Sequence, residues 1–138
     1  MNTELMFSSK SDIWATPQDF YNNLNAEFNF TLDPCALPTN AKCSKFYTPE
    51  QNGLKQDWSN ETVFCNPPYS DIKNWVEKAY NEAKRGAKVV MLIPARTDTR
   101  YFHDFIYNKH EVRFVKGRLK FGDQKNSAPF PSMVVVFS

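Results

Sequence analysis

Apolar residues recur with a helical period in the middle of the chain. The positions that share one face, spaced at i, i+3, i+4, i+7, i+8 and i+11, are Ile72, Trp75, Val76, Ala79, Tyr80 and Ala83. Lys84 and Arg85 suit the C-terminal turn of a helix, and Gly86 suits the position just beyond it. The pattern therefore predicts a helix that begins near Ser70-Asp71 and ends before Gly86.

Two other helices are predicted from their start signals. Thr16 followed by Pro17 is typical of an N-cap and a first helical position. Thr97 or Asp98 would cap a later helix. The inward face of that later helix would carry Tyr101, Phe102, Phe105 and Ile106.

Short apolar or alternating runs predict strands at 29–32, 62–65, 87–93, 111–115, 118–121 and 133–137, with 45–47 as a further candidate. The run at 87–93 is nearly continuous, which is typical of a strand covered on both faces. Lys116-Gly117 between two alternating runs predicts a hairpin. Because helices and strands alternate through the middle of the chain, the sequence predicts an α/β doubly wound sheet that is mostly parallel, with an antiparallel C-terminal edge.

The sequence Asn66-Pro67-Pro68-Tyr69 follows one of these strands and is the main chemical signal. The two prolines fix φ near −65° and remove two backbone donors. The Asn66 side-chain oxygen and the Pro67 carbonyl are then neighbouring acceptors, and Tyr69 offers a face on which a ring can stack. Such a loop suits a flat ring held by its exocyclic amine, although Asn-Pro and Pro-Pro are also ordinary turn signals.

Composition and charge narrow the picture only a little. With 138 residues, 41% hydrophobic and 15% aromatic, one domain spanning 1–138 is expected. The net charge of +2 permits contact with a polyanion without requiring it. No apolar run approaches a membrane span, and the three cysteines lack the spacing of a metal site, so we expect no membrane, no metal and free thiols in a reducing compartment.

Several motifs in a fixed order accompany the proline loop. They are Trp14-Ala15-Thr16-Pro17, Leu32-Asp33-Pro34-Cys35-Ala36, Asn40-Ala41-Lys42-Cys43, Gly53-Leu54 with Asp57-Trp58, Pro94-Ala95-Arg96-Thr97-Asp98-Thr99, Gly117-Arg118-Leu119-Lys120-Phe121 and Ala128-Pro129-Phe130-Pro131-Ser132. Together with Asn66–Tyr69 they run the whole length of the chain. On these residues the chain resembles the amino-group DNA methyltransferases, and within them the small phage-type family of N6-adenine DNA methyltransferases.

The resemblance implies an activity and a setting. The fold would be the Rossmann-like class I fold of S-adenosylmethionine-dependent methyltransferases. A methyl group would pass from S-adenosylmethionine to N6 of adenine in double-stranded DNA, with the base flipped out of the helix. Asn66, Pro67, Pro68 and Tyr69 would be catalytic. The resemblance further implies an enzyme encoded by a phage or prophage and located in the cytoplasm of a bacterial host. Without a separate target-recognition domain, a monomer or a weak homodimer is expected.

The resemblance also assigns cofactor residues. Asp33 would hold the methionine ammonium, alone or through water, in a segment with Pro34 and Ala36 that lacks the usual Gly-x-Gly. The alternative for Asp33 is a turn or cap aspartate. An N-terminal cofactor element would comprise Trp14, Thr16 and Pro17, whose alternative is a helix cap with a core tryptophan. Asp57 and Trp58 would serve the amine and the ring face of the cofactor's adenine.

DNA contacts are expected from basic residues near the site. Arg96 follows a buried strand, and a stripe of four cations in eight residues consists of Arg113, Lys116, Arg118 and Lys120. A charged outer face of a hairpin is the alternative for this stripe. The loop from Lys125 to Phe130 either closes over the flipped base or is a simple connection. Other functions left open are N4-cytosine methylation, protein glutamine methylation and DNA binding without catalysis.

Overall fold

The computed structural model describes residues 15–122 and 127–138. In chain order the main elements are α2 (Gln18–Phe28), β1 (Thr62–Cys65), α3 (Ile72–Lys84), β2 (Lys88–Pro94), β3 (Glu111–Phe114) and β4 (Ser132–Phe137). Short 3₁₀ turns lie at Gly53–Lys55 and Tyr69–Asp71, and a π-helical turn lies at Phe102–Ile106. None of the described helices has the length and apolar character needed to cross a bilayer.

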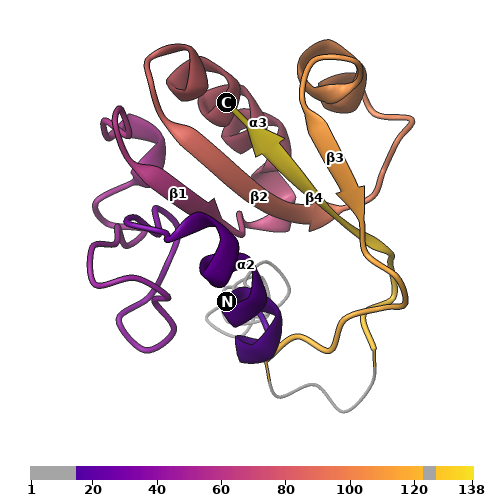
Figure 1. Ribbon diagram of the computed structural model, residues 1–138, viewed down its shortest axis with the longest axis horizontal. Coiled ribbons are helices and arrows are strands. Elements are labelled where there is room, and N and C mark those ends of the chain that lie inside the picture. The colour runs from indigo at the N-terminus through magenta and orange to yellow at the C-terminus, as the bar shows by residue number, and fades with distance from the viewer. Residues whose placement is uncertain (1–14, 123–126) are drawn as a thin grey trace, which may run out of the picture.

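The strands form a mixed sheet in the order β1-β2-β4-β3 (Figure 1). β1 runs parallel to β2, whereas β4 runs antiparallel to both β2 and β3. On the free side of β1, Leu32 makes a parallel bridge with Val63, and Asp33 makes one with Phe46. The α/β class is therefore confirmed, but the sheet among the described residues is mixed rather than mostly parallel, because its two central neighbours β2 and β4 run in opposite directions.

The sheet is covered on both faces, as Figure 1 shows for α2 and α3. Alternate side chains of β2 enter different cores: Met91 packs with Trp75 and Val76 of α3, and Leu92 packs with Tyr21 on the α2 side. Every residue of β2 after Lys88 is buried, and so is every residue of β4. The apolar run at 87–93 was thus correctly interpreted as a strand with two covered faces.

The best sequence signals are confirmed, and the weaker ones need correction. α3 spans the predicted helix, and Gly86 follows it with φ of +105°, a conformation that glycine adopts at low cost. The later helix is reduced to the turn at Phe102–Ile106, where the Phe102 amide donates to the Thr99 hydroxyl rather than to residue 97 or 98. The strand expected at 29–32 is only a bridge at Leu32.

The predicted hairpin between 111–115 and 118–121 is wrong. β3 pairs with β4 instead, because the apolar β4 places a complete ladder of hydrogen-bonding groups beside it. The alternation near residue 120 has another cause: Phe121 is 1% exposed and packs into the core on the α2 side, with Leu119 partly buried beside it. Inward packing of a loop can imitate the period of a strand over so few residues.

Candidate functional site

Three segments end at the same edge of the sheet and place their polar residues there. Asp33 follows the bridge of Leu32, Asn66 follows β1, and Arg96 comes two residues after β2. These segments run parallel to one another, so their carboxyl ends meet. Such an edge is where ligands bind in α/β sheets.

The loop Asn66–Tyr69 is held rigidly between β1 and α3. Pro67 is buried, and Pro68 has φ of −63° and ψ of 134° before the turn at Tyr69–Asp71. The Asp71 amide donates to the Pro68 carbonyl over 3.1 Å. The Asn66 side-chain nitrogen donates to the Thr16 hydroxyl over 3.0 Å. This bond fixes the amide of Asn66. The prediction of Thr16 as N-cap is corrected, because α2 begins one residue later than expected and its N-cap is Pro17, without a side-chain hydrogen bond.

The loop lies between two kinds of space. Asn66 lines two small cavities of about 20 and 30 Å³, one shared with Thr16 and Asp33 and the other with Ala36. Tyr69 lines a larger cleft of about 280 Å³, together with Pro94 and Tyr101. Each small cavity has room for about one water molecule, whereas the cleft approaches the roughly 300 Å³ at which small-molecule sites begin.

Asp33 is the buried acid of the site. It is 4% exposed and accepts hydrogen bonds from the backbone amides of Lys42 at 3.0 Å and Cys35 at 3.4 Å. Burial raises the pKa of its carboxyl to about 6, and these two amides oppose the rise. The Lys42 ammonium donates instead to Gln18 at 2.9 Å. A buried carboxylate with backbone donors only is suited to receive a cationic group of a ligand.

The segment behind Asp33 is packed tightly against the core. A Cβ placed on Gly53 would lie 2.1 Å from the Pro34 carbonyl oxygen, so only glycine fits there. The Gly53 carbonyl in turn accepts a hydrogen bond from the Trp58 indole at 3.0 Å. Pro34 therefore rests directly on the Gly53 turn.

Aromatic residues support the cleft. Phe130, which is 9% exposed, packs edge-on against Tyr69 with ring centroids 5.2 Å apart. Burial raises the pKa of the Tyr69 hydroxyl, which therefore stays protonated. The structure thus brings Phe130 to the proline loop, whereas Trp14 and residues 125 and 126 of the expected closing loop lie outside the described residues.

Asp57 and Trp58 are not part of this group. Trp58 is fully buried and stacks on Trp75, so its ring has no face for a ligand. Its backbone amide donates a hydrogen bond to the Glu82 carboxylate. Asp57 is exposed and caps the Ser59 amide at 2.8 Å. The expectation that Trp58 stacks on a cofactor is corrected, because the indole is needed to fill the core beneath α3.

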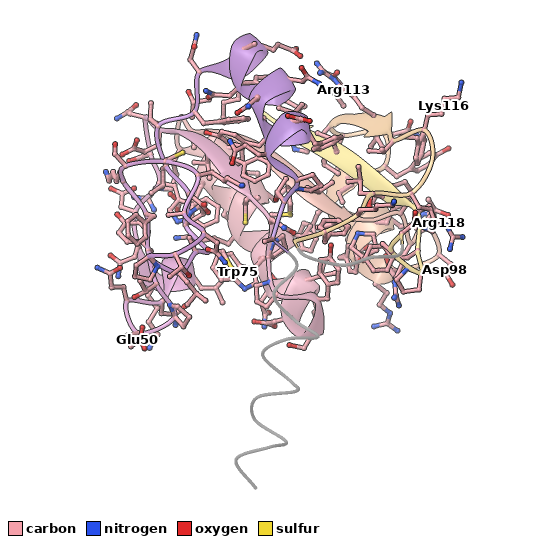
Figure 2. All side chains as sticks on the ribbon, turned by 90° about the horizontal axis from the view of Figure 1, so that it is seen from below. Glu50, Trp75, Asp98, Arg113, Lys116 and Arg118 are labelled. Atoms are coloured by element: carbon pink, nitrogen blue, oxygen red, sulfur yellow. The ribbon has the colours of Figure 1, made fainter. Side chains whose placement is uncertain are left out.

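The expected cations separate into two groups. Arg96 lines the cleft. Arg113 instead makes a two-pronged contact with Glu27 at 2.7 Å and a bond with Glu111 at 2.6 Å. Figure 2 shows Arg113, Lys116 and Arg118 at the side of the molecule far from Glu50. Lys116, Arg118 and Lys120 are exposed, and they line none of the three spaces around the loop.

Sequence reasoning missed several residues of the site. Lys73, Thr99 and Tyr101 line the cleft, and Asn40 lines a small cavity with Asp33. Lys73 lies in the first turn of α3, four residues after Tyr69 of the proline loop, and this proximity was the available signal. Within the described ranges, no group of three or more His, Cys, Asp or Glu side chains is placed to hold a metal ion.

Comparison with known proteins identifies the family. The family model described as DNA N-6-adenine-methyltransferase (Dam) matches residues 4–137. A DNA N-6-adenine-methyltransferase of Haemophilus phage HP1 is 34% identical over 138 residues, covering 94% of this chain and 80% of its own length. One of Escherichia phage T1 is 34% identical over 110 residues, covering 78% of this chain and 46% of its own length. The chain belongs to the DNA N-6-adenine-methyltransferase (Dam) family.

Proposed function

We propose that this chain methylates adenine in DNA, transferring a methyl group from S-adenosylmethionine to the exocyclic N6 of a flipped base. The observation that carries the proposal is the position of Asn66–Tyr69 between two spaces. One of the small cavities on one side is lined by the buried Asp33, and the larger cleft on the other side is lined by Tyr69. Membership of the family supports adenine over cytosine and over a protein amide.

The proline loop supplies acceptors to the substrate amine. The side-chain oxygen of Asn66 and the carbonyl oxygen of Pro67 accept hydrogen bonds from its two N–H groups, which favours a pyramidal nitrogen whose lone pair is free to attack. The same oxygens stabilise the positive charge that develops on that nitrogen. Because asparagine carries no charge, it is less costly to keep in this half-buried position than aspartate would be. The proton leaves after attack, so no strong base is needed beforehand.

The residues around Asp33 suit the chemistry of the methyl donor, but the cavities beside them are too small to hold it. S-adenosylmethionine supplies an activated methyl group on a sulfonium and carries an ammonium. Asp33 is the group that would bind that ammonium, with Thr16, Pro34 and Ala36 close to it. The cavities of about 20 and 30 Å³ must widen before the donor can enter. Donor binding should therefore move the segment that contains Asp33 or the segment of Ala15 and Thr16.

The substrate side is a cleft open to a flipped base. Tyr69 offers its ring for stacking, and the ring of Phe130 packs edge-on against it. An adenine inside a duplex does not reach the loop, so the base must leave the stack. The rigid connection between β1 and α3 keeps Tyr69 and Asn66 in fixed relation while the base enters.

Replacement of Asn66 by alanine tests this function. We expect the rate of methyl incorporation into plasmid DNA to fall by roughly 100-fold or more, because one positioned donor or acceptor contributes about that much to a rate. S-adenosylmethionine binding, followed by calorimetry, should remain within a few-fold of wild type. Incorporation at the wild-type rate by Asn66→Ala would reject the role of Asn66. A wild-type chain that binds DNA but shows no donor binding would instead be a non-catalytic binder.

A further inference from the structure

The cleft beside Tyr69 has a cationic rim that adenine binding does not use. Lys73 and Arg96 both line it, although they come from different parts of the chain. Lys73 stands on the first turn of α3, and Arg96 lies in the loop that follows β2. Two positive side chains thus converge on the space assigned to an uncharged base.

The loop that carries Arg96 is held by its own backbone bonds. The Arg96 amide donates to the Pro94 carbonyl over 2.9 Å, and the Arg96 carbonyl accepts from the Thr99 hydroxyl over 2.8 Å. The neighbouring Ala95 amide donates to the Pro131 carbonyl over 2.9 Å. The backbone that carries the Arg96 side chain is therefore fixed.

Neither cation forms an ion pair with another residue that the structure describes. The ion pairs found across residues 15–122 and 127–138 engage Lys45, Lys78, Arg85 and Arg113, but not Lys73 or Arg96. Both side chains are exposed. Two cations that form no ion pair with another described residue, beside a cleft of this size, indicate an anionic group of the ligand.

We propose that Lys73 and Arg96 bind the DNA phosphate next to the target adenosine, and so hold the strand while its base rests against Tyr69. The inference rests on the proposed function. A flipped nucleotide carries its phosphates with it to the mouth of the pocket, where the planar fork of arginine and the compact charge of lysine both suit phosphate oxygens. Reading a guanine edge would require Arg96 to enter a groove of the duplex, whereas it lines the pocket itself.

The test measures DNA binding without needing the target sequence. The ligand is a fluorescein-labelled duplex with one adenine opposite an abasic site, which lowers the cost of flipping. Lys73→Gln and Arg96→Gln should each weaken binding by about tenfold and lower the salt dependence of log K by up to about 0.9. Lys88→Gln removes the same charge at the opposite end of β2 and should change neither quantity. Unchanged affinity and salt dependence in both cleft variants would overturn the inference.

A neutral methylphosphonate placed on either side of that adenine sharpens the result. At the contacted position it should weaken wild-type binding about tenfold, weaken each single variant less, and add little to the loss in the double variant Lys73→Gln/Arg96→Gln. If the methylphosphonate weakens the variants as much as it weakens wild type, at either side of the adenine, the two cations do not contact this phosphate. If the loss of affinity in Arg96→Gln changes with the base next to that adenine, Arg96 reads a base. Both results contradict the inference. Salt dependence as expected without methyl transfer would instead reject the proposed function and leave the phosphate site standing.

Discussion

The Asn66 amide nitrogen donates a hydrogen bond of 3.0 Å to the Thr16 hydroxyl, across 50 positions of sequence. The bond turns the side-chain nitrogen of Asn66 toward Thr16. The side-chain oxygen therefore lies on the opposite side of the amide group. Thr16 is 5% exposed, so water does not compete for its hydroxyl. Thr16, two residues before α2, therefore controls the orientation of the Asn66 amide.

Replacing the Thr16 hydroxyl by a methyl group should slow the reaction. Thr16→Val keeps the shape but removes the acceptor, so Asn66 loses its fixed orientation. We expect kcat to fall by about 10- to 100-fold, with the KM for DNA nearly unchanged. Thr16→Ser restores the hydroxyl and should recover most of the rate. Equal losses in Thr16→Val and Thr16→Ser would show that packing, not the hydrogen bond, is what matters.

Donor binding should depend on the ionisation of Asp33. The pKa of this carboxyl is raised by burial to about 6, so the group is ionised at pH 7 and largely neutral at pH 5. An ammonium is attracted only to the ionised form. S-adenosylmethionine affinity, measured by calorimetry, should therefore weaken as the pH falls through 6. Asp33→Asn should bind weakly with little pH dependence in this range, and a pH-dependent affinity in that variant would assign the titration to another group.

The same group should make the free protein more stable in mild acid. Its pKa is higher in the folded chain than the ordinary value of 3.8, so the folded state binds the proton more tightly. The penalty of the buried charge is complete above pH 6, and it is relieved as the pH falls from 6 toward 4, by about 3 kcal/mol at most. Urea unfolding across this range should show that the free energy of unfolding of wild type gains this contribution as the pH falls. Asp33→Asn should show no such gain.

Trp58 should behave as a core residue. Trp58→Phe leaves the Gly53 carbonyl without the indole donor and loses ring volume, so the free energy of unfolding should fall by about 2 to 3 kcal/mol. Affinity for S-adenosylmethionine should stay within about twofold at a temperature where the variant is folded. A large loss of affinity without a loss of stability would restore the cofactor role predicted from the sequence. Asp57→Ala, on the exposed neighbour, serves as the control.

Arg113 should contribute little to DNA binding. Its guanidinium is held by Glu27 and Glu111, whose carboxylates raise its pKa further. A phosphate would have to displace these partners. Arg113→Gln should leave the salt dependence of DNA binding unchanged, in contrast to Arg96→Gln. A drop of about 0.9 in that dependence would show that the pair with Glu27 opens on binding.

Long periodic segments were predictable, and partners distant in sequence were not. α3 shows a helical period over several turns, and β2 shows an uninterrupted apolar run, so each element is specified by its own residues. The pairing of β3 with β4 was missed because residues 118–121 have the same short alternation. A local pattern of four residues does not state whether it packs into a core or joins a sheet.

The same limit applies to the site. The loop Asn66–Tyr69 was found because proline acts on its own backbone, independently of context. Trp58 was misassigned because a buried tryptophan and a ligand-stacking tryptophan look alike in sequence. The place of Lys73 in the cleft was missed because the cleft also needs the loop after β2, and the nearness of Lys73 to the proline loop does not report that loop.

Gly53 extends the functional constraints on this chain beyond the residues that face ligands. Even a methyl group at that position would displace the Pro34 carbonyl, and with it the neighbouring carboxylate of Asp33. A Gly53→Ala variant could thus stay folded and lose affinity for its methyl donor, although the altered atom touches neither donor nor DNA. Inactivating substitutions in this protein should accordingly be sought beneath the pocket wall as well as on its surface.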